Sequence, residues 1–196
     1  MKSIKLFFLL SSILLFTTSS IAQKLIYKVK VDGRDSGSLI AVKSGKKSNY
    51  QFSLQSKIKT TKIISIEINY ELKSIFENGK LKSSNLIQYV NGIKQVENST
   101  SQQGDHYIFK DISGNQKTIS ENILTAIPEL YFTEPKNKNK IWSDNQGNFL
   151  PIKKIGANYQ LITGENQNSI YTYEKGVCKK VETTQAFSTI TFELVQ

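Results

Sequence analysis

The stretch TKIISIEINYEL, Thr61 to Leu72, alternates between apolar and polar residues in a way that decides the fold class. Its apolar positions fall on every second residue: Ile64, Ile66, Ile68, Tyr70 and Leu72. A period of two places alternate side chains on opposite faces of a β-strand. We therefore expect a strand with one face in the core and the other in water.

The same alternation occurs along most of the chain after Gln23, for example in Leu25–Val31, Tyr50–Leu54 and Ile190–Leu194. Turn signals separate these runs, and the pairs Asn78-Gly79 and Asn91-Gly92 favour type I′ hairpins, because both residue types tolerate positive φ. Short strands joined by close turns are typical of an antiparallel meander. The sequence predicts one all-β domain over residues 23–196, mainly antiparallel, built as a strongly curved meander sheet or half-barrel of about ten strands.

One segment of the predicted domain has a helical pattern. Ser120 is a candidate N-cap, and the apolar residues that follow it fall near one helical face. Pro128 interrupts this pattern, so the helix is either short or ends before Ile127. We expect a short helix near Asn122 to Leu130, on the concave side of the sheet. A polar loop follows it, and Trp142 begins the return to strand structure.

The first 22 residues have the layout of a secretory signal peptide. Lys2 and Lys5 precede an apolar run, Leu6–Phe16, and small residues lead to a cleavage site after Ala22. A membrane anchor is the alternative, but the apolar run is shorter than the roughly 20 residues that span a bilayer. We expect an exported protein of the periplasm or the extracellular space, without a transmembrane segment after cleavage.

Charge and cysteine content restrict the possible partners. The formal net charge of +10 falls to about +8 without the two lysines of the signal peptide, and Arg34 is the only arginine. Nucleic-acid proteins rely on arginine for bidentate contacts, so we expect no nucleic-acid partner. Cys178 has no cysteine partner in the chain and lies in an alternating run, where we expect a buried apolar residue rather than a reactive thiol.

Candidate catalytic and metal-binding residues are few. His106 is the only histidine, so a Cys-His pair would have to join it to Cys178. The spacings of zinc ligands are absent, and no metal or other cofactor is predicted. The serines between Ser53 and Ser74 are interpreted as outward polar positions. A hydrolase would have to use dispersed acidic residues: Asp105, Asp111, Glu129, Glu134 and Asp144. We predict no catalytic residues and no enzyme.

Aromatic residues near the prolines are the best candidates for ligand binding. A curved sheet that wraps a helix can leave an apolar groove, where small ligands or acyl chains bind. The residues expected to line its mouth are Trp142, Tyr131, Phe132 and Phe149. The alternative is that these side chains cover the core under the proline-rich loop.

Several stretches resemble an uncharacterised "domain of unknown function" family of small exported proteins from Bacteroidota. They are LIYKVKVDGRDSGSLIAV, IEINYELKSIFENGKLKSSNLIQYVNG, ELYFTEPKNKNKIWSDNQGNFLPIKKIGANYQL and YTYEKGVCKKVE. More distantly, the chain is similar to the β half-barrels that carry lipoproteins or lipids across the periplasm. This resemblance implies a fold and a compartment but no site residues.

Three functions are compatible with these observations. The first is a non-catalytic module of the periplasm or envelope that binds an apolar or amphiphilic ligand, such as a lipid. The second is a structural or interaction protein of the envelope with a solid core, whose partner is an envelope component. The third is a hydrolase with dispersed acidic residues.

Overall fold

The computed structural model describes residues 22–61, 65–185 and 188–195. The predicted signal peptide lies almost entirely outside these residues, as does Ile64 of the opening stretch. The elements of the chain are β1 (Gln23–Val31), β2 (Arg34–Lys46), β3 (Asn49–Thr61), β4 (Ser65–Glu77), β5 (Lys80–Val90), β6 (Ile93–Gln103), β7 (His106–Lys110), β8 (Gln116–Ile119), the 3-10 helix η1 (Ile127–Tyr131), β9 (Lys140–Ser143), β10 (Asn148–Ile155), β11 (Asn158–Gly164), β12 (Gln167–Glu174), β13 (Val177–Gln185) and β14 (Ser188–Leu194).

All the strands belong to one 14-stranded sheet in the order β8-β7-β6-β5-β4-β3-β2-β1-β14-β13-β12-β11-β10-β9. Each strand of this order pairs antiparallel with its neighbours, and the pairing of β1 with β14 joins the two ends of the chain. The sheet therefore has two arms, β1–β8 and β14–β9, that begin at its centre. The all-β, antiparallel fold class is confirmed, with 14 strands where about ten were expected.

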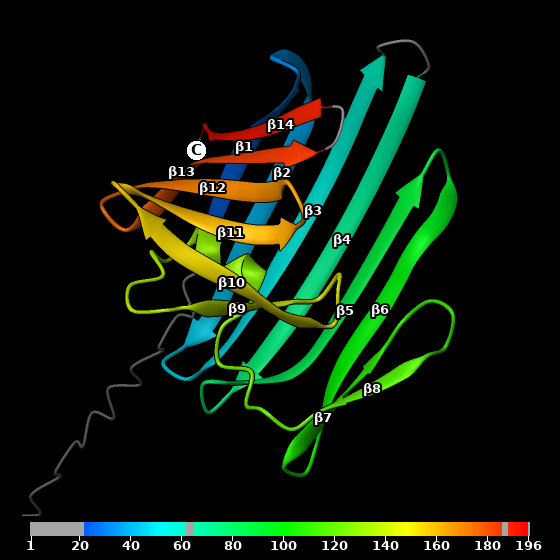
Figure 1. Cartoon of the computed structure of the whole chain (residues 1–196), viewed down its shortest axis with the longest axis vertical. Helices are drawn as coiled ribbons and strands as arrows, with labels where there is room; N and C mark the ends of the chain where they lie inside the picture. Colours follow the sequence, from blue (N-terminus) through cyan, green and yellow to red (C-terminus); the bar gives the residue numbers. More distant parts are fainter. Residues whose placement is uncertain (1–21, 62–64, 186–187, 196) are drawn as a thin grey trace, which may run out of the picture.

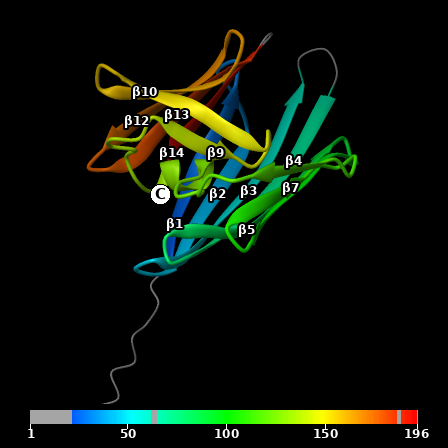
Figure 2. The same cartoon turned by 60° about the horizontal axis from the view of Figure 1, so that its bottom comes forward.

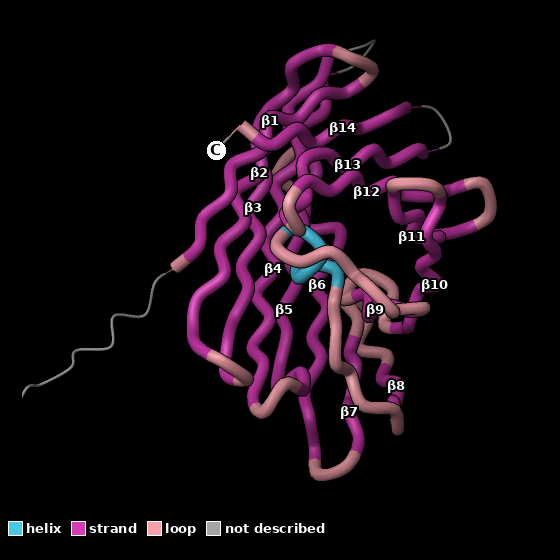
Figure 3. The backbone as a smooth tube through the Cα atoms, turned by 90° about the vertical axis from the view of Figure 1, so that its left-hand side faces the viewer, coloured by secondary structure: helices cyan, strands magenta, loops and turns pink. Residues whose placement is uncertain are grey.

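The two arms curve toward each other without closing into a barrel, and η1 lies between them (Figures 1, 2 and 3). The edge strands β8 and β9 are consecutive along the chain, and the segment between them crosses the concave side. η1 contacts β3 on one arm and β9 and β13 on the other. The core thus lies between the concave face of the sheet and this crossing segment.

The predicted hairpins are confirmed in the turns between β4 and β5 and between β5 and β6. Asn78 and Gly79 have φ of 53° and 73°, and Asn91 and Gly92 have φ of 50° and 79°. Two successive residues with positive φ are the mark of a type I′ turn, whose twist matches that of the strands it joins.

The helix is shorter and later in the chain than the sequence predicts. Residues 122–126 are not helical, and a 3-10 helix begins at Ile127 and ends at Tyr131. Pro128 was interpreted as an interruption, but it lies in the first turn of this helix. That position suits proline, because its fixed φ is helical and the first turn has no use for its missing N–H. The expected location on the concave side is confirmed.

Burial of the apolar face of β4 decreases toward the start of the strand. Leu72 is buried, Tyr70 and Ile68 are partly exposed, and Ile66 is 39% exposed. The alternation of Thr61–Leu72 therefore identifies the face correctly but not the depth of its burial. In Figure 1 this end of β3 and β4 extends beyond the strands of the opposite arm.

Candidate functional site

The four aromatic residues predicted to line a groove belong to the packing around η1. Trp142 is 0% exposed, Tyr131 and Phe132 are each 6% exposed, and Phe149 is partly buried. Trp142, Tyr131 and Phe132 are therefore core residues and do not lie at the mouth of a groove. The alternative interpretation, in which these side chains cover the core, describes their position.

The structure brings the four residues together only in part. The rings of Trp142 and Phe149 meet edge to face at 5.4 Å. Tyr131 contacts the ring of Tyr27 in β1, and Phe132 stacks on Phe52 in β3. Tyr131 also meets the ring of Tyr171 in β12, on the other arm, at 6.4 Å. Aromatic pairs of this kind add to the stability gained by burial, so η1 and its flanks hold the two arms together.

Phe149 lines a depression of about 160 Å³ between the β8–η1 segment and the loop before β9. The Nζ of Lys140 lies 4.9 Å from the centre of the Phe149 ring and forms an ion pair with Glu121. Pockets for small-molecule ligands usually have volumes of roughly 300 Å³ or more. This depression is too small to hold such a ligand.

A row of buried hydroxyl groups crosses the concave face of β4, β5 and β6. Ser74 is paired with Ser84, and Ser84 with Thr100, so neighbouring side chains of the row lie roughly 5 Å apart. Their exposures are 0%, 6% and 1%, and none of the three hydroxyl oxygens has a hydrogen-bond partner among the described residues. Buried polar groups are rarely left unpaired, and an ordered water or a ligand is the common explanation.

Asp144 faces this row from the turn between β9 and β10. It is 3% exposed, and its Oδ1 accepts a hydrogen bond from the indole N–H of Trp142 at 3.2 Å. Its Oδ2 is buried without a hydrogen bond of good geometry among the described residues, although the Ser84 hydroxyl lies close enough to lower the pKa of the carboxyl group. Burial raises the pKa of Asp144 to about 6, although the nearby Ser84 hydroxyl and Trp142 N–H oppose the shift. The carboxyl group therefore remains mostly ionised at neutral pH and keeps one free acceptor.

Asn98 of β6 holds the turn of Asp144 against the sheet. Its side-chain amide donates to the backbone oxygens of Asp144 and Asn145, at 3.1 Å and 2.9 Å. In the register of the sheet, Asn98 is the position on the concave face next to Thr100. The position of Asp144 over the hydroxyl row is thus fixed by hydrogen bonds to the opposite arm.

Tyr70 lies between Asp144 and the partly exposed end of the concave face. Burial raises its pKa well above the ordinary value, and the nearby charge of Asp144 raises it further. The side chain nevertheless keeps exposed surface. Its partner across the sheet is Ser56, whose buried hydroxyl also lacks a hydrogen-bond partner among the described residues.

These buried serines correct the interpretation of the sequence. Ser56 and Ser74 were expected on the outer face, but they are 6% and 0% exposed on the concave face. Ser74 continues the even-numbered series of Tyr70 and Leu72, so the period of two already placed it on the core side. The residue type misled the interpretation, because serine is usually exposed.

The Cys-His pair that a thiol enzyme would need is not assembled. His106 is in β7 of one arm, where its Nδ1 lies 3.1 Å from Oδ1 of the exposed Asp105. Cys178 is in β13 of the other arm and is 0% exposed, as predicted, and burial raises the pKa of its thiol to about 12. A thiol in this environment stays protonated and is a poor nucleophile.

The other acidic candidates have separate surroundings. Asp111 accepts hydrogen bonds from the turn that follows β7, Glu134 accepts one from the hydroxyl of Tyr159, and Glu129 lies near Lys43. Within the described ranges, no group of three or more His, Cys, Asp or Glu side chains is placed to hold a metal ion. The described residues also contain no helix with the length and hydropathy needed to cross a membrane.

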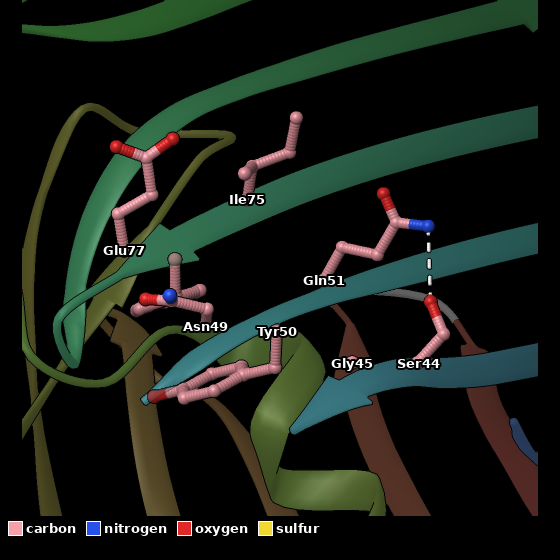
Figure 4. A pocket seen from close by; sticks show the side chains of 8 residues that line it. Ser44, Gly45, Asn49, Tyr50, Gln51, Ile75 and Glu77 are labelled. Carbon is pink, nitrogen blue, oxygen red and sulfur yellow. Dashed lines mark hydrogen bonds between the residues drawn. The ribbon is translucent and has the colours of Figure 1, made fainter. Parts of the chain in front are cut away.

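Two further depressions lie away from the concave face. One, of about 460 Å³, lies beside the β2–β3 turn, where Gln51 donates to the hydroxyl of Ser44 at 3.0 Å (Figure 4). The other, of about 420 Å³, is lined by Lys136, Asn137, Lys138, Lys154 and Tyr159. The first is lined by polar and apolar residues of β2, β3 and β4, and the second by loop residues with Lys154 of β10 and Tyr159 of β11. Neither lining includes a buried unpaired group like that of Asp144.

Comparison with known proteins agrees with this fold. The family model described as "Domain of unknown function (DUF6134)" matches residues 27–195. Among solved structures, the chain is similar to a beta-barrel-like protein of the domain of unknown function DUF1849 from Brucella abortus. The TM-score is 0.56 and the identity is 9%, over 88% of this chain and 95% of that one. No curated protein matches the chain. The expected uncharacterised family and half-barrel-like fold are confirmed, and an origin in Bacteroidota stays a prediction.

Proposed function

The chain belongs to the family of the domain of unknown function DUF6134, and we propose that it is a non-catalytic module that binds an apolar or amphiphilic molecule on the concave face of its sheet. The name of the family carries no activity, so the proposal rests on geometry. We further propose that the protein works after export, in the periplasm or outside the cell, as its N-terminal sequence predicts.

The observation that carries the proposal is a strip of partly exposed apolar residues at the open end of the concave face. Ile68 is paired with the buried Ile58 at the edge of the core, and Ile66 follows Ile68 on the same face of β4. Val96 lies two strands away from β4, opposite Gln88. Ile66 is 39% exposed, and Ile68 and Val96 are partly buried against the core. Apolar side chains that continue a core without being covered by it mark a place where an apolar partner can bind.

The alternative with a specific observation in its favour is a structural or interaction protein of the envelope. The aromatic packing of Trp142, Tyr131 and Phe132 fills the middle of the molecule, as a solid core would. Only a binding module should take up an apolar probe saturably at the open end of the concave face, so this measurement distinguishes it from a structural protein. A hydrolase has less support, because the acidic candidates lie in separate surroundings.

Titration with N-phenylnaphthylamine, a neutral dye that fluoresces in apolar environments, tests the proposal. The variant Ile68→Gln introduces an amide on the concave face. The matched control Ile87→Gln makes the same change at a partly buried position on the outer face of the neighbouring strand. We expect saturable binding to the wild type, a roughly tenfold loss of affinity in Ile68→Gln, and little change in the control.

Two results would contradict the proposal. One is the absence of saturable dye binding by the folded wild-type protein. The other is an equal effect of both isoleucine substitutions, which would place the dye elsewhere or reflect a general loss of stability. Thermal melting of both variants separates a local effect on binding from such a loss.

A further inference from the structure

We propose that Asp144, with the hydroxyl row of Ser74, Ser84 and Thr100, forms the polar end of the ligand site and selects amphiphiles with a cationic, hydrogen-bond-donating head group. Primary alkylamines are the simplest members of this class. The inference rests on the proposed function, because it assigns the head-group class for the ligand of the same site.

The first step of the argument is the hydrogen-bonding state of the site. Asp144 Oδ2 and the hydroxyl oxygens of Ser74, Ser84 and Thr100 are buried without a partner among the described residues. All four atoms can accept hydrogen bonds; each hydroxyl group can also donate one, as Ser84 is placed to do toward Asp144, whereas the carboxylate can only accept. An ammonium group supplies three donors and no acceptor, so it complements this set of atoms.

The second step is charge. The side chains that act on Asp144 from β5 and β9 are Ser84 and Trp142, and both are neutral. A negative head group placed beside the ionised carboxyl group would meet repulsion that the buried surroundings screen poorly. A positive head group would gain attraction from the same cause. The site therefore disfavours carboxylate, sulfate and phosphate head groups.

The third step connects the polar end to the apolar strip. Ser56 of β3 and Tyr70 of β4 are cross-strand neighbours that lie between the polar end and the apolar strip. Tyr70 is close enough to Asp144 for the charge of the carboxyl group to raise the pKa of the Tyr70 hydroxyl. Ile68 follows Tyr70 on the same face of β4, about 7 Å further along the strand. An amphiphile can thus place its head group near Asp144 while its alkyl chain lies along Ile68 and its neighbours.

The predicted preference opposes the overall charge of the protein. With a formal net charge of +10, nonspecific attraction would favour an anionic amphiphile over a cationic one. Preference for the cation would therefore report a local feature of the site.

The test measures displacement of bound N-phenylnaphthylamine by decylamine and by decyl sulfate, which have alkyl chains of equal length. At about pH 8, where Asp144 is ionised, we expect decylamine to displace the dye at a concentration roughly tenfold lower than decyl sulfate. The isosteric variant Asp144→Asn should bring the two concentrations together. The control Glu71→Gln removes a carboxylate next to Tyr70 in sequence but on the outer face, and it should leave the preference intact.

A second measurement needs no variant. Lowering the pH to about 5 protonates Asp144 in the wild type and should reduce the preference for decylamine. The groups beside Asp144 are Tyr70 of β4, Ser84 of β5, Asn98 of β6 and Trp142 of β9, and Lys117 of β8 donates to Gly147 of the same turn. The pKa of Tyr70 is raised well above its ordinary value, so its hydroxyl does not change its charge in this range. Both probes keep their charge between these pH values, so the change belongs to the protein.

The outcomes separate this inference from the proposed function. If the dye does not bind, the proposed function fails and the inference fails with it. If the dye binds but decyl sulfate displaces it as well as decylamine does, or Asp144→Asn leaves the preference unchanged, the head-group assignment is wrong while the binding module stands. A preference for decylamine that disappears in Asp144→Asn and at low pH supports both.

Discussion

Asp144 is a carboxyl group that the fold holds in an unfavourable environment at neutral pH. The indole N–H of Trp142 donates to it and the Ser84 hydroxyl lies nearby, but burial outweighs both and raises its pKa from 3.8 to about 6. A group that binds its proton more tightly in the folded state than in the unfolded state favours folding while it is protonated. Its contribution is fully present below about pH 4 and is lost as the pH rises through about 6.

The variant Asp144→Asn should remove this dependence. We expect it to be more stable than the wild type at about pH 8, by an amount on the order of 2 kcal/mol, and to lose this advantage as the pH falls toward 4. Urea unfolding of both proteins at several pH values measures the difference. Subtracting the two curves cancels the contributions of Asp35, Asp105 and Glu134, whose lowered pKa values act in the opposite direction. A difference that does not change with pH would show that Asp144 is not the titrating group.

At the scale of elements, the two arms meet through side chains where the strands do not pair. The β9–β10 turn receives hydrogen bonds from Asn98 of β6 and from Lys117 of β8, whose Nζ donates to the backbone oxygen of Gly147 at 3.2 Å. Phe109 of β7 packs edge to face on Trp142 at 6.3 Å. These contacts close one end of the molecule and leave the other end, near Ile66 and Ile68, open.

Gly147 packs closely against Phe109 in this contact between the arms. Its φ is +61°, and a Cβ added to it would lie 2.5 Å from Cδ1 of Phe109. We expect Gly147→Ala to lower the free energy of unfolding by about 2–4 kcal/mol, because it adds overpacking to an unfavourable backbone conformation. Gly156→Ala is the matched control: its φ is +57° but nothing lies within 4 Å of the added carbon, so it should cost about 1 kcal/mol.

Thermal or urea unfolding of both alanine variants measures the two effects. Equal destabilisation by both would show that the backbone conformation alone matters and that the turn does not press on Phe109. Partial rescue of Gly147→Ala by Phe109→Leu would support the contact directly, since a smaller side chain leaves room for the methyl group.

Local sequence patterns predicted the individual strands and turns better than they predicted which strands pair with each other. The alternation at Leu25, Tyr27 and Val29 identified a buried face, and all three side chains are in the core. The Asn-Gly pairs identified two hairpins. The pairing of β1 with β14 was not predictable in the same way, because it joins the ends of the chain and no local pattern encodes it.

The site was predicted less well than the fold. The aromatic residues were recognised as important, and the interpretation that they cover the core agrees with their burial. The groove interpretation stayed open because the sequence does not show that η1 carries Tyr131 into the space between the arms. The hydroxyl row was missed, since serine was interpreted as an outer residue. The period of two nevertheless placed Ser74 with Leu72 on the concave face, which was the available signal.

At the scale of the whole molecule, one continuous sheet joins all 14 strands. The chain starts at the centre of the sheet, runs to one edge, crosses the concave side through η1 and returns from the other edge to the centre. η1 contacts both arms, so neither arm can lose its packing without uncovering core residues of the other. If residues 23–196 form a single domain, as predicted, all parts of the sheet should unfold together in one cooperative transition.

Two single residues make this cooperativity measurable. Trp142 reports the packing at edge strand β9, and Cys178 is buried in β13 nearer the centre of the sheet; both are 0% exposed. We expect tryptophan emission, labelling of the thiol and the far-ultraviolet circular dichroism of the strands to give the same midpoint in urea. The thiol should be unreactive before the transition, because burial raises its pKa to about 12 and excludes the reagent. If Trp142 changed its emission at a lower urea concentration than the other two probes, the β9–β10 hairpin would open separately from the sheet. The hairpin carries Asp144, so such early opening would also provide a route by which a ligand reaches the hydroxyl row.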